Sequence, residues 1–118
     1  MAELIPAPTR IPVPGGKVIE EYVGRVNTGE AAVSVAHMVA PGGWEEPAQA
    51  PDFDEITLVL RGRVRIEHPG GVLDVRAGQA VVSRAGERVR YTTPDDEGAE
   101  YVAICLPAFS PQLANREE

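Results

Sequence analysis

The sequence predicts an all-β domain, either a sandwich or a barrel. Glycine and proline supply 12 and 11 of the 118 residues, and they recur between short runs rich in β-branched residues. The chain is 43% hydrophobic, which is too apolar for a disordered chain, so these residues punctuate a folded structure. Short strands bounded by glycine and proline turns are typical of all-β sandwiches and barrels. No sustained helical period is found between residues 17 and 106.

The expected elements follow one another along a single domain of residues 1–118, since domains typically contain 50–250 residues. Residues 1–16 are rich in proline and are expected to form an extended N-terminal arm. The barrel core is expected over residues 31–106, and residues 107–118 are expected to form a C-terminal tail with one short helical turn. Strands are expected over residues 31–39, 53–60, 63–67, 72–76, 80–83, 88–92 and 100–106.

Composition argues against several classes of partner. Eleven basic and eighteen acidic side chains give a net charge of −7, which argues against nucleic-acid binding because such binding neutralises phosphates with Lys and Arg. The single cysteine, Cys105, cannot form an internal disulfide and is compatible with a reducing compartment. Residues 1–16 lack the pattern of a signal peptide, and no apolar run approaches a membrane span of about 20 residues. We therefore expect a cytoplasmic protein with neither a nucleic-acid nor a membrane partner.

The stretch from Gly43 to Gly62 resembles the first motif of the cupin family. That motif reads Gly, five residues, His-x-His, three or four residues, Glu, six residues, Gly. Gly43, Glu55 and Gly62 keep these spacings, whereas Gln49 and Pro51 stand where the family has its two histidines.

The second cupin motif, Gly, five residues, Pro-x-Gly, two residues, His, is matched in frame by Gly78 and Gly86. Arg84 and Val89 stand where proline and histidine are usual. The resemblance covers about residues 31–106 and implies a jelly-roll barrel, the double-stranded β-helix of the cupins. The closing strand AEYVAICLPAF and the Glu-rich first motif are similar in part to EutQ-type ethanolamine-utilisation cupins.

The resemblance also implies a degenerate metal site. Cupins usually hold a divalent metal with two histidines and a glutamate from the first motif and a histidine from the second, and only Glu55 remains of those four. A transition-metal site needs three or four converging ligands, so we expect no standard metal cofactor. A non-standard divalent site remains open, and its candidate ligands are His37, Glu46, Gln49 and Glu55.

Strand alternation predicts which side chains enter the barrel. Because the motif glutamate points inward, Glu55 and Thr57 are expected to line the interior, and Val89 and Tyr91 are expected to do so from the second motif. His37 shares a strand face with three valines and is expected to point inward too, unless a β-bulge reverses it. The outward face carries apolar residues through which cupins often pair, so we expect a homodimer through Ile56, Leu58 and Leu60.

Two functions remain open at this point. The first, which we prefer, is a small-molecule-binding cupin with its ligand held near Glu55. Its other ligand-binding candidates are Trp44, Glu46, Gln49, Phe53, Thr57 and Val89. The second is an isomerase, lyase or cyclase acting on a sugar, hydroxy-acid or polyketide-like substrate. In that enzyme a buried Glu55 with a raised pKa would act as general acid or base together with His37 or Tyr91.

Overall fold

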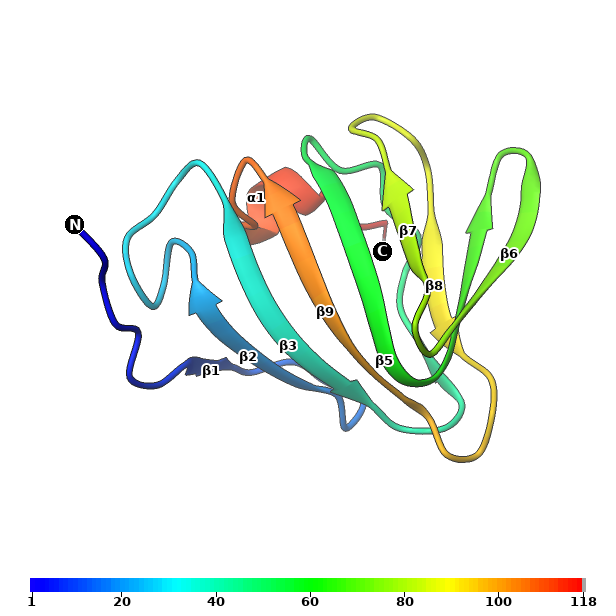
Figure 1. Cartoon of the computed structure of the whole chain (residues 1–118). Coiled ribbons are helices and arrows are strands. Elements are labelled where there is room, and N and C mark those ends of the chain that lie inside the picture. Colours follow the sequence, from blue (N-terminus) through cyan, green and yellow to red (C-terminus); the bar gives the residue numbers. More distant parts are fainter. Residues whose placement is uncertain (118) are drawn as a thin grey trace.

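The computed structural model describes residues 1–117 and consists of antiparallel strands curled into a half-barrel (Figure 1). The predicted all-β jelly-roll fold is confirmed. The elements are β1 (Thr9–Ile11), β2 (Val18–Val23), β3 (Ser34–Ala40), β4 (Trp44–Glu45), β5 (Asp54–His68), β6 (Gly71–Arg76), β7 (Ala80–Ser83), β8 (Arg90–Thr93), β9 (Ala99–Leu106) and α1 (Pro111–Ala114).

Strand β5 joins the two walls of the barrel. The strands follow the order β1-β2-β3-β9-β5-β8-β4, and β6 and β7 also pair with β5. The first half of β5 pairs with β7 and β9, whereas its second half pairs with β6 and β8. The long bent strand therefore passes from one wall to the other, as the green ribbon in Figure 1 shows.

The continuity of β5 corrects the prediction of separate strands over residues 53–60 and 63–67. Gly62 does not end the strand but bends it, with a φ of +78° that other residues rarely adopt. A Cβ atom placed on Gly62 would lie 2.1 Å from the carbonyl oxygen of Gly98. The glycine thus permits a close approach of two backbones inside a strand, which the sequence alone does not distinguish from a turn.

Two strands lie before the first one expected from the sequence. The expected N-terminal arm contains β1, which pairs with β2 from Thr9↔Glu21 to Ile11↔Ile19. The tail contains α1, whose first turn is capped by the Ser110 side chain accepting a hydrogen bond from the Leu113 amide. Residue 118, the last of the expected tail, lies outside the described residues. Among residues 1–117 no helix is long and apolar enough to cross a membrane.

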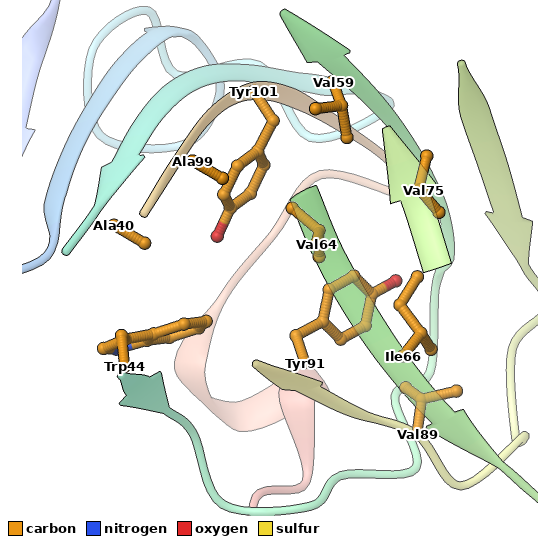
Figure 2. Close-up of a cluster of buried hydrophobic side chains, with 10 residues drawn as sticks. All are labelled: Ala40, Trp44, Val59, Val64, Ile66, Val75, Val89, Tyr91, Ala99 and Tyr101. Atoms are coloured by element: carbon orange, nitrogen blue, oxygen red, sulfur yellow. The ribbon is translucent and has the colours of Figure 1, made fainter. Parts of the chain in front are cut away.

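Apolar side chains fill the barrel in two clusters. The larger cluster is drawn in Figure 2 and contains Ala40, Trp44, Val59, Val64, Ile66, Val75, Val89, Tyr91, Ala99 and Tyr101. The smaller one contains Phe53, Cys105 and Ala114, with Phe109 and Leu113 packed against it. The rings of Phe53 and Phe109 meet edge to face, with their centroids 5.9 Å apart. The smaller cluster attaches the C-terminal segment to the barrel.

Candidate functional site

Charged side chains from distant segments of the chain come together near the mouth of the barrel, and four of them form the cluster described here. Lys17, Glu46, Glu55 and Arg116 all line an interior cavity of about 40 Å³. Lys17 immediately precedes β2, Glu46 follows β4, Glu55 lies in β5, and Arg116 lies in the segment after α1. All except Glu55 also line a second cavity of about 240 Å³, which we call the mouth cavity. The fold therefore gathers a charged cluster from four segments that are distant in sequence.

Glu55 lines the interior cavity but, unlike Lys17, Glu46 and Arg116, does not border the mouth cavity. It pairs with Ser83 of β7 and Cys105 of β9, and strand alternation directs its side chain into the barrel with that of Thr57. Burial raises its pKa to about 7, and the neighbouring Glu46 carboxylate adds to the rise. The positive charges of Lys17 and Arg116 oppose this rise. Glu55 therefore exchanges its proton near neutral pH.

Lys17 and Glu46 are buried close together, and each shifts the pKa of the other. Burial raises the pKa of Glu46 against the opposing charges of Lys17 and Arg116. Burial lowers the pKa of Lys17 against the opposing carboxylates of Glu46 and Glu55. The Lys17 ammonium lies 4.0 Å from the centroid of the Trp44 ring and 5.4 Å from that of Tyr101, so two aromatic faces stabilise this cation.

The formal charge of the cluster changes by one when Glu55 gains or loses its proton. With Glu55 protonated, Lys17, Arg116 and the Glu46 carboxylate carry a formal charge of +1. With Glu55 ionised, the formal charge is zero. Two other carboxylates line the cavities and are satisfied elsewhere: Glu45 pairs with Arg90, and Glu21 accepts hydrogen bonds from the Val26 and Asn27 amides. The mouth is therefore suited to an anion when Glu55 is neutral and less suited to it when Glu55 is charged.

Hydroxyl groups line the barrel behind the charges. The Tyr91 hydroxyl lies 3.0 Å from Ser83 Oγ. Thr57 Oγ1 and the Tyr101 hydroxyl are buried without a hydrogen-bond partner among residues 1–117. An unpaired buried polar group costs about 1–3 kcal/mol. Tyr101 lines the interior cavity, whose volume of about 40 Å³ has room for water beside its hydroxyl.

Most of the residues predicted for the site lie where strand alternation places them. Glu46, Gln49, Phe53 and Tyr91 line the interior cavity together with Glu55. The remaining buried candidates are Trp44, which borders the mouth cavity, and Thr57 and Val89, which are packed in the barrel. On the opposite face of β5, Leu58 and Leu60 are 41% and 48% exposed.

His37 is the exception, and the expectation that it points inward is wrong. The inward face of β3 is formed by Ser34, Ala36 and Met38, which line the interior cavity. His37 lies on the other face, where its Nε2 is 2.6 Å from Glu100 Oε2. The valines that share its face are only partly covered, so their apolar character does not mark the barrel side. His37 therefore cannot serve as proton carrier for Glu55.

Lys17 and Arg116 are the site residues that sequence reasoning missed. Lys17 is the only lysine in the chain, and Arg116 belongs to the expected tail. Neither belongs to a spaced motif, and both reach the cluster only through long-range packing. The only available signal was a solitary lysine beside a glycine pair at the start of an unassigned strand.

The residues do not fit the non-standard metal site considered above. Within residues 1–117 no group of three or more His, Cys, Asp or Glu side chains could hold a metal ion. His37 points away from Glu46 and Glu55, and these two carboxylates instead face the cations of Lys17 and Arg116. We therefore derive no chemistry through a metal.

Comparison with known sequences links the chain to an endoribonuclease. No family model matches the chain. The chain is 43% identical over 107 residues to Endoribonuclease YbeY of Myxococcus xanthus. The match covers 91% of this chain and 36% of that protein, so the chain spans about a third of the relative.

Comparison with solved structures shows the fold alone, because the identities lie below 20%. A variant of oxalate decarboxylase from Bacillus subtilis is similar with a TM-score of 0.78 and 16% identity, over 92% of this chain and 30% of that one. A conserved protein of unknown function from Streptococcus pyogenes has a TM-score of 0.68 and 15% identity, over 83% of this chain and 80% of that one. Ethanolamine utilization protein Q from Salmonella typhimurium has a TM-score of 0.61 and 17% identity, over 79% and 71% of the two chains.

The sequence relative corrects the family and the function expected above. The cupin assignment and the partial likeness to EutQ-type proteins are overturned by this relative. Both rested on the spacing of glycines, which fixes turns and therefore indicates the fold rather than the function. The relative is named as an endoribonuclease, which overturns both the small-molecule-binding cupin and the cupin isomerase, lyase or cyclase. The expectation that no nucleic acid is involved is wrong on the same ground. Net charge is a sum over the whole chain and does not reveal the two cations gathered at the mouth.

Proposed function

We propose that this chain takes part in RNA processing by binding a phosphate group of RNA at the barrel mouth. The observation that carries the proposal is the 43% identity to Endoribonuclease YbeY over 91% of this chain. The chain spans 36% of that protein, and we assign to it the binding of RNA rather than its cleavage. A reducing, cytoplasmic location is part of the proposal, because Cys105 is a buried free thiol.

Two cations at the mouth support phosphate binding. Arginine presents a planar fork of donors that matches phosphate oxygens, and lysine adds a compact point charge. Arg116 and Lys17 both border the mouth cavity of about 240 Å³. With Glu55 neutral, the formal charge of +1 on the cluster complements the single negative charge of one phosphodiester group. The mouth therefore suits one phosphate of an RNA chain.

The interior of the barrel is too small to admit a nucleotide, so the proposed RNA contact lies at the mouth. The interior cavity of about 40 Å³ holds a few water molecules and is far too small for a nucleotide, since sites for small ligands measure about 300–1,000 Å³. RNA must therefore remain at the mouth, where Lys17, Glu46 and Arg116 are within its reach. Glu55 does not contact the RNA, and its protonation state sets the net charge of the cluster.

The net charge of −7 limits the extent of the contact. An extended phosphate track requires many clustered Lys and Arg residues, whereas this surface is predominantly acidic. A single phosphate held by two cations is compatible with such a surface. Weak binding with a shallow dependence on salt is the expected behaviour.

Fluorescence anisotropy with a short single-stranded RNA tests the proposal. A Lys17→Met variant removes the ammonium while keeping an unbranched stem against Trp44. Losing one charge-assisted contact is expected to weaken binding about tenfold or more. The matched control is Arg76→Gln, because Arg76 is exposed on β6 and borders neither cavity. Equal affinities for the wild type and Lys17→Met, or no binding by the wild type at low salt, would refute the proposal.

A further inference from the structure

The C-terminal segment, residues 111–117, runs beside the loop that forms one side of the mouth. The Asp52 amide donates to the Leu113 carbonyl at 2.8 Å, and the Glu117 amide donates to the Ala48 carbonyl at 2.8 Å. Between them the Asn115 side chain donates to the Ala50 carbonyl at 3.0 Å. The segment therefore presents Arg116 to the site along a defined backbone path.

The two ends of this segment are fastened differently. Before Asn115, the fully buried Ala114 packs against Phe53 and Cys105. Beyond Asn115 the segment is held by polar contacts. Arg116 Nε donates to Gln49 Oε1 at 3.2 Å, and the Arg88 guanidinium donates twice to the Glu117 carboxylate, at 2.6 and 3.0 Å.

Arg88 is itself fixed to the mouth. The next residue, Val89, exchanges two backbone hydrogen bonds with Gln49, at 2.9 and 2.8 Å. Gln49 also contacts Arg116, so the Arg88–Glu117 pair closes a small ring of interactions around Arg116. Breaking that pair removes one of the contacts that hold the outer end, beside the Glu117–Ala48 and Arg116–Gln49 hydrogen bonds and the Arg116–Phe109 contact, and so loosens this end while its apolar end stays packed.

We propose that the Arg88–Glu117 ion pair is a positioning pair that holds Arg116 at the barrel mouth, beside Glu46 and Glu55. The consequence for RNA rests on the proposed function, because it requires Arg116 to contact phosphate. The placement of Arg116 at the mouth does not rest on the proposed function, because the pKa of Glu55 reports it without RNA. The charge of Arg116 opposes the raised pKa of Glu55, so the loss of Arg116 from the mouth raises that pKa further.

Carboxyl NMR titration of Glu55 tests the placement in four full-length proteins. These are the wild type, Arg116→Gln, Arg88→Glu and the double variant Arg88→Glu/Glu117→Arg, which restores the pair with its charges exchanged. Arg116→Gln and Arg88→Glu are both expected to raise the pKa of Glu55, and the double variant is expected to return it to the wild-type value. A pKa that does not change in Arg88→Glu, or that is not restored in the double variant, would overturn the inference.

Amide exchange and RNA binding supply two further readouts. Both side chains of the pair are at least half exposed, so Arg88→Glu is expected to accelerate exchange of the Glu117 amide only roughly two- to fivefold. It should weaken RNA binding in the same direction as Arg116→Gln but by a smaller factor, and the double variant should restore the affinity. If the wild type binds no RNA, the proposed function fails, while the titration and exchange results still decide whether the pair positions Arg116. An unchanged exchange rate in Arg88→Glu contradicts the positioning role.

Discussion

Replacing Glu55 with glutamine should make the stability of the protein less dependent on pH. Burial and the Glu46 carboxylate raise the pKa of Glu55 from its ordinary value of 4.5 to about 7. The folded protein thus keeps a proton between these pH values that the unfolded chain releases, so stability falls as pH rises through this window. Each tenfold change in proton affinity corresponds to 1.36 kcal/mol, so ionised Glu55 destabilises the folded state by about 3 kcal/mol. Glutamine keeps the shape of the side chain and cannot ionise.

Urea denaturation between pH 4.5 and 8.5 measures this effect. The free energy of unfolding of Glu55→Gln, relative to the wild type, is expected to increase by about 3 kcal/mol over this range and to level off above pH 7. Glu46 and Lys17 are present in both proteins, so the difference reports mainly on Glu55. Glu97→Gln is the matched control, because Glu97 is exposed and lines neither cavity. A difference for Glu55→Gln that is constant with pH would refute the electrostatic reasoning.

Three further expectations follow from the same structure. RNA affinity should decrease severalfold between pH 6 and pH 8 in the wild type but not in Glu55→Gln, as measured by anisotropy, because ionisation of Glu55 cancels the positive charge of the mouth. Gly62→Ala should cost more than about 1 kcal/mol in urea denaturation, because φ is +78° and the added Cβ meets the Gly98 carbonyl; an unaffected midpoint would contradict the bend in β5. His37→Ala should leave RNA affinity unchanged and alter stability by at most about 1 kcal/mol, because His37 forms a partly exposed pair with Glu100 outside the barrel.

The sequence predicted the fold well because turns are local. Gly78 and Gly86 both adopt positive φ values at the ends of strands, and such positions can be recognised from a short stretch of chain. Gly62 also has a positive φ but lies inside β5, where it permits contact with Gly98. The error at Gly62 arises because the partner that requires glycine is remote in sequence.

The site could be predicted only in part. Strand alternation placed Glu55 and Tyr91 correctly, because neighbours on one strand determine the direction of a side chain. The same rule failed for His37, because a half-barrel leaves its outer face partly covered and apolar valines occupy that face as well. Lys17 and Arg116 reach the mouth through tertiary packing of the two ends of the chain, and no local pattern records that packing.

The salt dependence of RNA binding tests the central claim most directly. The affinity of the wild-type chain for a single-stranded RNA should be measured at pH 6 over a range of salt concentrations. Each phosphate neutralised on a single strand contributes a slope of about −0.7 to the plot of log K against log salt concentration. A single phosphate neutralised at the mouth should give a slope of about −0.7, and Lys17→Met should reduce its magnitude. A slope of zero, or a steep slope that Lys17→Met leaves unchanged, would contradict phosphate binding at the barrel mouth.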